Sequence, residues 1–156
     1  MEFKVGQIFA TDEEKLSVAI AEAHLGLSEG GIPIGAALFD ENGALLGSGH
    51  NLRVQEGDAS MHGETSAFRN AGRQKSYRKV TLATSLSPCW YCSGLIRQFG
   101  IGRVLVGDDK NFMGGQDWVA EHGAEVHVMN DPGLIKLMGD FIENNDVLWN
   151  EDIGEE

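Results

Sequence analysis

Short apolar runs alternate with segments of helical periodicity along the chain, and this order restricts its fold more than any other feature. A hairpin is expected over 34–50, where an apolar strand leads through Asn42 and Gly43 as the turn into a second strand. Three further runs have the length and composition of buried strands, at 79–85, 103–107 and 125–129. The chain therefore contains five predicted strands.

Helical segments occupy the stretches between these strands. The first begins with the capping-box spacing of Thr11 and Glu14. The last begins with Asp131 as the N-cap and Pro132 at the first helical position. The five predicted helices span 11–31, 62–73, 88–100, 114–123 and 131–145.

This order of elements predicts an α/β protein with a single domain over residues 1–156. We expect a three-layer α/β/α sandwich around a five-stranded mixed sheet. The sheet should be mostly parallel, with an antiparallel hairpin and right-handed crossovers between the later strands. Residues 49–60 are polar and are expected to be irregular, and the acidic stretch 146–156 carries apolar anchors such as Trp149 and Ile153.

The charge composition restricts the classes of partner. Twelve Lys and Arg residues against 24 Asp and Glu residues give a formal net charge of −12 at pH 7. Such a chain repels phosphate backbones, so nucleic acid is not expected as a partner. No apolar run approaches the roughly 18 residues of a membrane helix, and the first residues lack the pattern of a signal peptide. We therefore expect no membrane partner and a cytoplasmic location.

The two cysteines of the chain, Cys89 and Cys92, directly follow Pro88. Disulfides, redox pairs and metal sites all use this spacing, but a reducing compartment disfavours a structural disulfide. Pro88 is expected in the first turn of the 88–100 helix. There, the helix dipole and free N–H groups lower thiol pKa values. This placement suits a zinc site and equally a redox pair.

His62 and Glu64 form an H-x-E motif at the start of another predicted helix. A catalytic zinc ion needs three protein ligands and one open position. His62, Cys89 and Cys92 supply three ligands. The open position takes a water whose pKa zinc lowers toward about 7, and Glu64 remains free to carry protons.

Two alternatives fit these motifs less well. A structural zinc site has four protein ligands, and the remaining candidate, His50, lies in a stretch without clear ligand spacing. A redox pair explains neither the H-x-E motif nor the proline before the first cysteine. An H-x-E motif followed by P-C-x-x-C is the signature of zinc-dependent base deaminases. We therefore predict one catalytic Zn²⁺ per subunit.

Longer stretches extend this pattern over nearly the whole chain, namely EGGIPIGAAL, GSGHNLR, HGETSAFRNAGR, TSLSPCWYC, DDKNF and WNEDIGE. With them the chain resembles the cytidine deaminase-like superfamily, and within it the free-base cytosine deaminases of the fungal type. The first and last stretches indicate the free-base branch. The resemblance implies the cytidine deaminase-like fold, a homodimer and a small-molecule nucleobase substrate. It further implies hydrolysis of cytosine to uracil and ammonia, with a role in pyrimidine salvage.

The resemblance also implies roles for individual residues. Glu64 would move protons beside the zinc ligands, Asn51 would hydrogen-bond the pyrimidine edge, and Asp152 would accept the ring N–H that a ribose replaces in a nucleoside. Residues 145–156 would form a C-terminal lid. The other implied pocket residues are Ile34 and Gly35 on the floor, Leu86 and Ser87 with backbone groups near the leaving amine, and Phe112, Trp149 and Ile153 in the walls.

Several alternatives stay open on sequence grounds. Asn51 also suits a turn, and Asp152 also suits a merely acidic tail. The bulky Trp90 and Tyr91 between the cysteines are expected to pack into the core face of their helix, to reshape the pocket or to form a dimer contact. They leave isocytosine, guanine or a triazine open as the substrate. A nucleoside or tRNA deaminase and a non-catalytic zinc-binding module are less favoured readings, because of Asp152 and Glu64 respectively.

Overall fold

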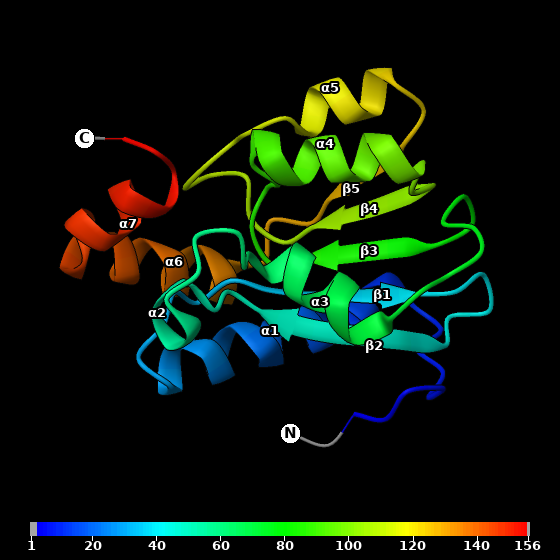
Figure 1. Cartoon of the computed structure of the whole chain (residues 1–156), viewed down its shortest axis with the longest axis horizontal. Helices are drawn as coiled ribbons and strands as arrows, with labels where there is room; N and C mark the ends of the chain where they lie inside the picture. The colour runs from blue at the N-terminus through cyan, green and yellow to red at the C-terminus, as the bar shows by residue number, and fades with distance from the viewer. Residues whose placement is uncertain (1–2, 156) are drawn as a thin grey trace.

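A five-stranded mixed sheet forms the centre of the computed structural model, which describes residues 3–155 (Figure 1). Its strands are β1 (Gly35–Phe39), β2 (Leu45–His50), β3 (Thr81–Thr84), β4 (Arg103–Val106) and β5 (Glu125–Val128). Their order across the sheet is β2-β1-β3-β4-β5. β1 runs antiparallel to β2 and β3, whereas β3, β4 and β5 run parallel to one another. The predicted mixed sheet and its antiparallel hairpin are confirmed.

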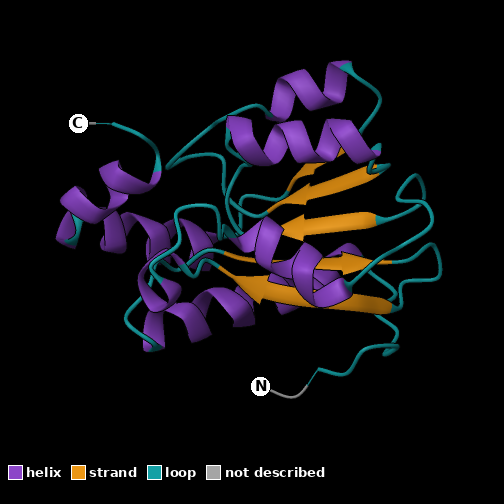
Figure 2. Cartoon of the chain, in the orientation of Figure 1, coloured by secondary structure: helices purple, strands orange, loops and turns teal. Residues whose placement is uncertain are grey.

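Helices cover both faces of this sheet (Figure 2). They are α1 (Asp12–Ser28), α2 (Arg53–Glu56), α3 (Gly63–Ala71), α4 (Trp90–Phe99), α5 (Gln116–Glu121), α6 (Pro132–Asn144) and α7 (Asp146–Asp152). Alternate strand residues point to opposite faces. Phe39 of β1 therefore packs with α1 and α6, whereas Leu38 packs with α3, α4 and α5. This arrangement confirms the three-layer α/β/α sandwich.

Two glycines of β2 allow α3 to lie directly on the sheet. A Cβ atom at Gly49 would lie 2.3 Å from the Ser66 hydroxyl oxygen, and one at Gly47 would lie 2.4 Å from the backbone nitrogen of Ala71. Any side chain at either position would push the helix away. This close packing fixes the first turn of α3, which carries the H-x-E motif.

The local structure differs from the sequence expectations at three places. The stretch 49–60 contains α2, a single helical turn that ends at Gly57 in the left-handed conformation. Helix α4 starts at Trp90 with Cys89 as its N-cap, so Pro88 precedes the helix instead of occupying its first turn. The tail forms α7, and Trp149 anchors this helix in a cluster with Phe141 of α6.

Because β2, β3 and β4 point in the same direction, the segments that follow them meet at one edge of the sheet. These segments begin at Asn51, Ser85 and Gly107. Ligands of open α/β sheets bind outside the carboxyl ends of the strands. Within residues 3–155, no helix combines the length and the apolar character that a membrane crossing requires.

Candidate active site

A pocket lies at this edge of the sheet, between the loops and α7. It encloses about 330 Å³ of space, its open mouth included. Its lining combines apolar walls with a few polar side chains, as small-molecule sites generally do. The lining residues are Ile34, Asn51, His62, Gly63, Glu64, Leu86, Ser87, Cys89, Phe112, Trp149, Asp152 and Ile153.

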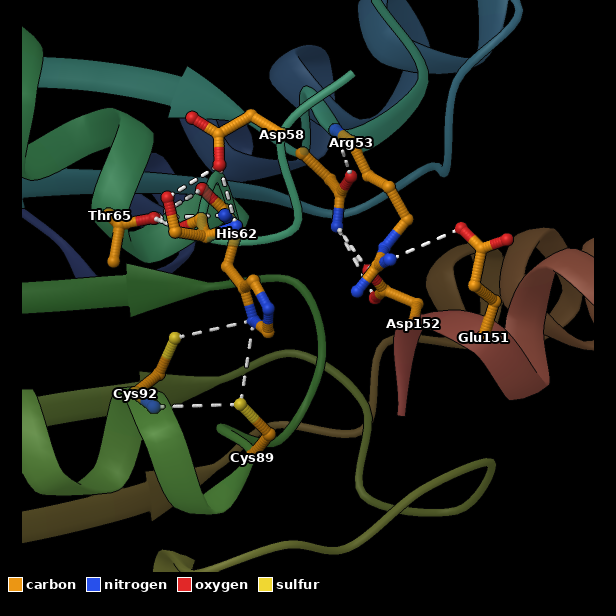
Figure 3. Close-up of polar contacts among 10 residues, drawn as sticks. Arg53, Asp58, His62, Thr65, Cys89, Cys92, Glu151 and Asp152 are labelled. Carbon is orange, nitrogen blue, oxygen red and sulfur yellow. Dashed lines mark hydrogen bonds and ion pairs between the residues drawn. The ribbon is translucent and has the colours of Figure 1, made fainter. Parts of the chain in front are cut away.

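His62, Cys89 and Cys92 converge at one end of the pocket (Figure 3). His62 is the N-cap of α3, Cys89 is the N-cap of α4, and Cys92 lies in the first turn of α4. The His62 Nδ1 atom lies 3.5 Å from the Cys89 Sγ atom and 3.7 Å from the Cys92 Sγ atom. Both cysteines are free thiols.

These distances fit a tetrahedral zinc ion. Zinc bonds of about 2.3 Å to sulfur and about 2.0–2.1 Å to nitrogen, at a tetrahedral angle, place the nitrogen about 3.6 Å from each sulfur. The three side chains therefore suit zinc without rearrangement. Three ligands leave a fourth position free, which is the pattern of a catalytic zinc site.

Hydrogen bonds among the three ligands shift their pKa values. The hydrogen bond with Cys92 lowers the pKa of the Cys89 thiol to about 4, and His62 acts in the same direction. The same bond and burial raise the pKa of Cys92 well above its ordinary value. Burial lowers the pKa of His62, but the hydrogen bond to Cys89 and the charge of Glu64 raise it to about 9. Metal binding must displace these protons, so it depends on pH.

Glu64 lies in the first turn of α3 beside the metal ligands, and only 4% of the residue is exposed. Burial raises the pKa of its carboxyl group to about 7, and the nearby Cys89 sulfur adds to this rise. A group with a pKa near the working pH can both accept and donate a proton. The position and pKa of Glu64 therefore suit general acid–base chemistry.

Asn51 and Asp152 face each other at the opposite end of the pocket. Asn51 is fully buried, and its Nδ2 atom lies 3.2 Å and 3.3 Å from the two carboxylate oxygens of Asp152. The Asn51 Oδ1 atom accepts a hydrogen bond of 2.9 Å from the backbone N–H of Arg53. These contacts fix the amide so that its NH₂ group donates toward Asp152 and the pocket.

Aromatic and aliphatic side chains form the walls between these two ends. The rings of Phe112 and Trp149 meet edge to face, with centroids 5.7 Å apart. Asp108 shapes the loop that carries Phe112, because its buried carboxylate accepts hydrogen bonds from the backbone of Lys110 and Asn111. The structure thus brings Phe112 and Trp149 together with the predicted Ile34, Leu86 and Ile153.

One of the expected pocket residues, Gly35, is placed differently from the expectation, and another, Ser87, has one backbone group already engaged. Gly35 does not line the pocket, because the backbone of α1 packs against it; a Cβ atom there would lie 2.2 Å from the Ala19 oxygen. Ser87 does line the pocket, but its N–H already donates to the Asp108 carbonyl oxygen at 2.8 Å. The Ser87 N–H is therefore engaged, and the other backbone groups near Leu86 and Ser87 remain to meet a leaving amine.

Trp90 and Tyr91 do not pack into the core face of α4, contrary to one sequence expectation. They are 66% and 49% exposed and lie outside the lining of the pocket. The Tyr91 hydroxyl donates to the Ser60 carbonyl oxygen, and its ring lies edge-on to His62 with centroids 5.0 Å apart. Exposure follows from the helical period, because Cys92, Ser93 and Ile96 form the buried face of α4 and Trp90 and Tyr91 lie off that face.

Sequence reasoning missed Arg53 and Gly63. The Arg53 guanidinium lies 2.7 Å from Asp152 and 3.1 Å from Glu151. Gly63 lines the pocket and packs against Ile34. Arg53 ends the stretch GSGHNLR, and Gly63 lies in the stretch HGETS. No local pattern connects Arg53 with Asp152, which is 99 positions away.

The fold and the pocket define a zinc-dependent deaminase, a hydrolase that acts on amino-heterocycles. Residues 9–108 match the family described as the cytidine and deoxycytidylate deaminase zinc-binding region. The chain is 45% identical to a cytosine deaminase of Candida albicans over 92% of its own length and 97% of that enzyme. The chain therefore belongs to this zinc-binding deaminase family.

More distant relatives share parts of the sequence or the fold. A tRNA-specific adenosine deaminase of Haemophilus influenzae is 34% identical over 99 residues. The matched part is 62% of this chain and 57% of that enzyme. The structure of a guanine deaminase from Nitrosomonas europaea superposes with a TM-score of 0.74 over 87% of each chain, at 18% identity. That structure supports the fold alone.

Proposed function

We propose that this protein hydrolyses free cytosine to uracil and ammonia. One observation carries the proposal: a fixed donor, Asn51, lies beside an acceptor, Asp152, opposite the His62, Cys89 and Cys92 cluster. Asn51 and Asp152 suit one edge of a pyrimidine ring. The metal-ligand cluster suits the hydrolytic removal of the exocyclic amine of the ring. The cytosine deaminase of Candida albicans, with its 45% identity, supports the same substrate.

The recognised edge follows from the orientation of the Asn51 amide. Because its Oδ1 atom is engaged by the Arg53 N–H, Asn51 presents an N–H donor to the pocket. The O2 atom of cytosine accepts this bond, and Asp152 accepts the adjacent N1–H in a charge-assisted hydrogen bond. A nucleoside lacks N1–H and leaves Asp152 unpaired, which a buried site penalises strongly. Isocytosine, with its C2 amine at the metal cluster, would place its C4 oxygen at Asn51 but a C5–H group at Asp152, which leaves the carboxylate without a donor.

Glu64 moves the protons of the reaction. A bound zinc ion would lower the pKa of a water toward about 7. Glu64 would pass one proton of that water to N3 of cytosine. It would pass the second proton, from the oxygen that becomes O4, to the C4 amine, which leaves as ammonia. Burial raises the pKa of the Glu64 carboxyl group, and a carboxyl group with a raised pKa suits both directions of transfer. Phe112, Trp149 and Ile153 exclude bulk water from the ring.

We further propose that residues 145–156 act as a lid and that the domain spans 1–156. The described part of this lid, α7, contributes Trp149, Asp152 and Ile153 to the pocket. The base must pass this segment to enter and to leave, so lid motion contributes to turnover. Ile34, Leu86 and a backbone group of Ser87 complete the proposed base site.

The proposed assembly is a homodimer. Trp90 and Tyr91, at consecutive positions of α4, expose large aromatic side chains, and aromatic residues are enriched at protein interfaces. Light scattering of the purified protein tests this assembly; a monomeric mass would contradict it.

The proposed location is the cytoplasm, where Cys89 and Cys92 remain thiols able to bind zinc. The proposed biological role is pyrimidine salvage.

The experiment that tests the function is ammonia release by the zinc-loaded protein. The substrates are cytosine, isocytosine, cytidine, adenine and guanine, and Glu64→Ala is the control that retains zinc but not the proton carrier. We expect turnover of cytosine but not of cytidine, and loss of this turnover in the variant. Turnover of guanine or isocytosine alone would overturn the assignment of cytosine but retain the zinc-dependent chemistry.

A further inference from the structure

Arg53 connects two parts of the pocket that are distant in sequence. It lies in the single turn of α2, and its side chain reaches α7 (Figure 3). The Arg53 Nε atom donates to the Asp152 Oδ1 atom at 2.7 Å, and the Nη1 atom donates to the Glu151 Oε2 atom at 3.1 Å. One guanidinium thus binds two consecutive acids of α7.

The contact with Asp152 is buried, whereas the contact with Glu151 is not. The side chains of Arg53 and Asp152 are 15% and 4% exposed, and the side chain of Glu151 is 59% exposed. A buried carboxylate without a counter-charge is costly, so the Asp152 pair constrains the structure far more than the exposed Glu151 pair does. Arg53 is therefore the cation that pairs with the Asp152 carboxylate at the pocket wall.

The hydrogen bonds also leave one Asp152 oxygen less engaged than the other. Oδ1 accepts the short bond from Arg53 and a 3.2 Å contact from Asn51, whereas Oδ2 has only the 3.3 Å contact from Asn51. Oδ2 is thus the oxygen with capacity for a further donor. The backbone N–H of Arg53 meanwhile fixes the Asn51 amide. The same residue orients the donor and the acceptor of the proposed base edge.

We propose that Arg53 is a positioning residue: its guanidinium orients the Asp152 carboxylate toward the ring N–H of the substrate and holds α7 over the pocket. The substrate part of this proposal rests on the proposed function, but the hold on α7 does not. Arg53 itself lies outside the lining of the pocket and acts through Asp152.

The test compares Arg53→Gln with Arg69→Gln as a matched control. Arg69 also forms an ion pair near α2, with Glu56, but both partners are well exposed and neither contacts α7. The first measurement is hydrogen exchange of the amides in α7, on zinc-loaded protein without substrate. We expect at least tenfold faster exchange over residues 146–154 in Arg53→Gln and no change in Arg69→Gln.

The second measurement separates positioning from general stability. In Arg53→Gln we expect KM for cytosine to rise at least tenfold, with kcat changed less than threefold, because Asp152 would bind the ground state and the transition state alike. We also expect the preference for cytosine over 1-methylcytosine, which lacks the ring N–H, to fall at least tenfold. A displaced Asp152 no longer penalises the missing proton.

Two further variants sharpen the outcome. Glu151→Gln should change both measurements by less than twofold, since it removes only the exposed contact. Arg53→Lys should recover part of the preference, because it keeps the charge but cannot donate to both acids with the same geometry. This variant carries the test if Arg53→Gln does not fold.

Unchanged exchange of α7 and an unchanged preference would overturn the proposal. If the wild type fails to deaminate cytosine, the proposed function fails, and the exchange measurement alone decides whether Arg53 holds α7.

Discussion

The two ends of the pocket are held by different kinds of structure. The metal half (His62, Glu64, Cys89 and Cys92) lies on the first turns of α3 and α4, whose inner faces pack against the buried sheet. The recognition half (Asn51, Arg53 and Asp152) depends on polar contacts of the loop after β2 and the turn of α2 with α7. The residues of the proposed chemistry and those of the proposed base contacts therefore lie on separate supports. We therefore expect changes in the recognition half to leave zinc binding at the metal half intact.

Removal of a metal ligand should have the largest effect and should reach beyond activity. Cys92→Ala deprives zinc of a fully buried ligand, so we expect loss of bound zinc and of all measurable turnover. The free energy of zinc binding is also folding free energy, so the melting temperature should no longer rise when zinc is added. Ser93→Ala, at the next position of α4, is the control and should retain zinc. A Cys92→Ala variant that binds zinc in a one-to-one ratio would contradict the ligand assignment.

Glu64→Gln should separate chemistry from metal binding within the metal half. The amide cannot carry protons, and general acid–base catalysis contributes about 10²–10⁴-fold. We therefore expect kcat to fall by about this factor while zinc content and KM remain near those of the wild type. Steady-state kinetics together with metal analysis of the same sample measures both quantities. Loss of zinc in this variant would show that Glu64 supports the metal site as well.

Asn51→Ala should weaken the recognition half alone. The variant removes the fixed donor and leaves the Arg53 N–H without its partner, at a cost of about 1–3 kcal/mol. We expect kcat/KM for cytosine to fall by about 10- to 100-fold, with zinc content and the affinity for zinc unchanged. A competition assay with a metal chelator checks the affinity. A decrease in zinc affinity equal to the decrease in kcat/KM would show that the two halves are coupled.

The smallest expected effect concerns His50, the last residue of β2, which directly precedes Asn51 of the recognition half. His50 lies between Glu22 and Glu29, which hydrogen-bond its two ring nitrogens at 2.8 Å and 2.7 Å. The hydrogen bond to Glu22 raises the pKa of His50, burial opposes this rise, and Glu29 adds to it. The protonated ring therefore stabilises the fold fully below the unfolded-state pKa of about 6.5. This contribution is lost as the pH rises through the higher folded-state pKa.

We therefore expect the free energy of unfolding of the wild type to decrease between pH 6 and pH 9 by about 1 kcal/mol more than that of His50→Gln. Urea unfolding at a series of pH values measures the difference. Parallel pH profiles of the two proteins would show that His50 does not change its charge between the two acids. Zinc content should vary with pH in the same way in the two proteins, since His50 is not a ligand of the proposed site.

The metal half could be predicted from the sequence because its residues are local. His62 and Glu64 are two residues apart, Cys89 and Cys92 are three apart, and each pair marks a helix start. The sheet followed from the alternation of apolar runs with helical segments. The helix start at Pro88 was predicted wrongly, because proline suits both the first turn and the preceding extended residue.

The recognition half required the structure. Arg53 and Asp152 are 99 residues apart, and the pairing of a polar loop with a distant acid has no periodic signature. The helix α7 was missed because its few apolar residues, chiefly Leu148 and Trp149, give it almost no pattern of its own. It gains its stability from the cluster around α6. Gly35 was expected on the floor of the pocket from the family resemblance, and the sequence does not show that the backbone of α1 packs against it.

The fixed amide of Asn51 has a consequence for regulation. In the proposed reaction only the C4 and N3 positions of the ring change, whereas the O2 and N1–H groups that meet Asn51 and Asp152 are common to cytosine and uracil. The contacts that select the substrate therefore retain the product equally well. Uracil should compete with cytosine for the free enzyme, so the removal of uracil by the reaction that next consumes it would govern the flux through this protein.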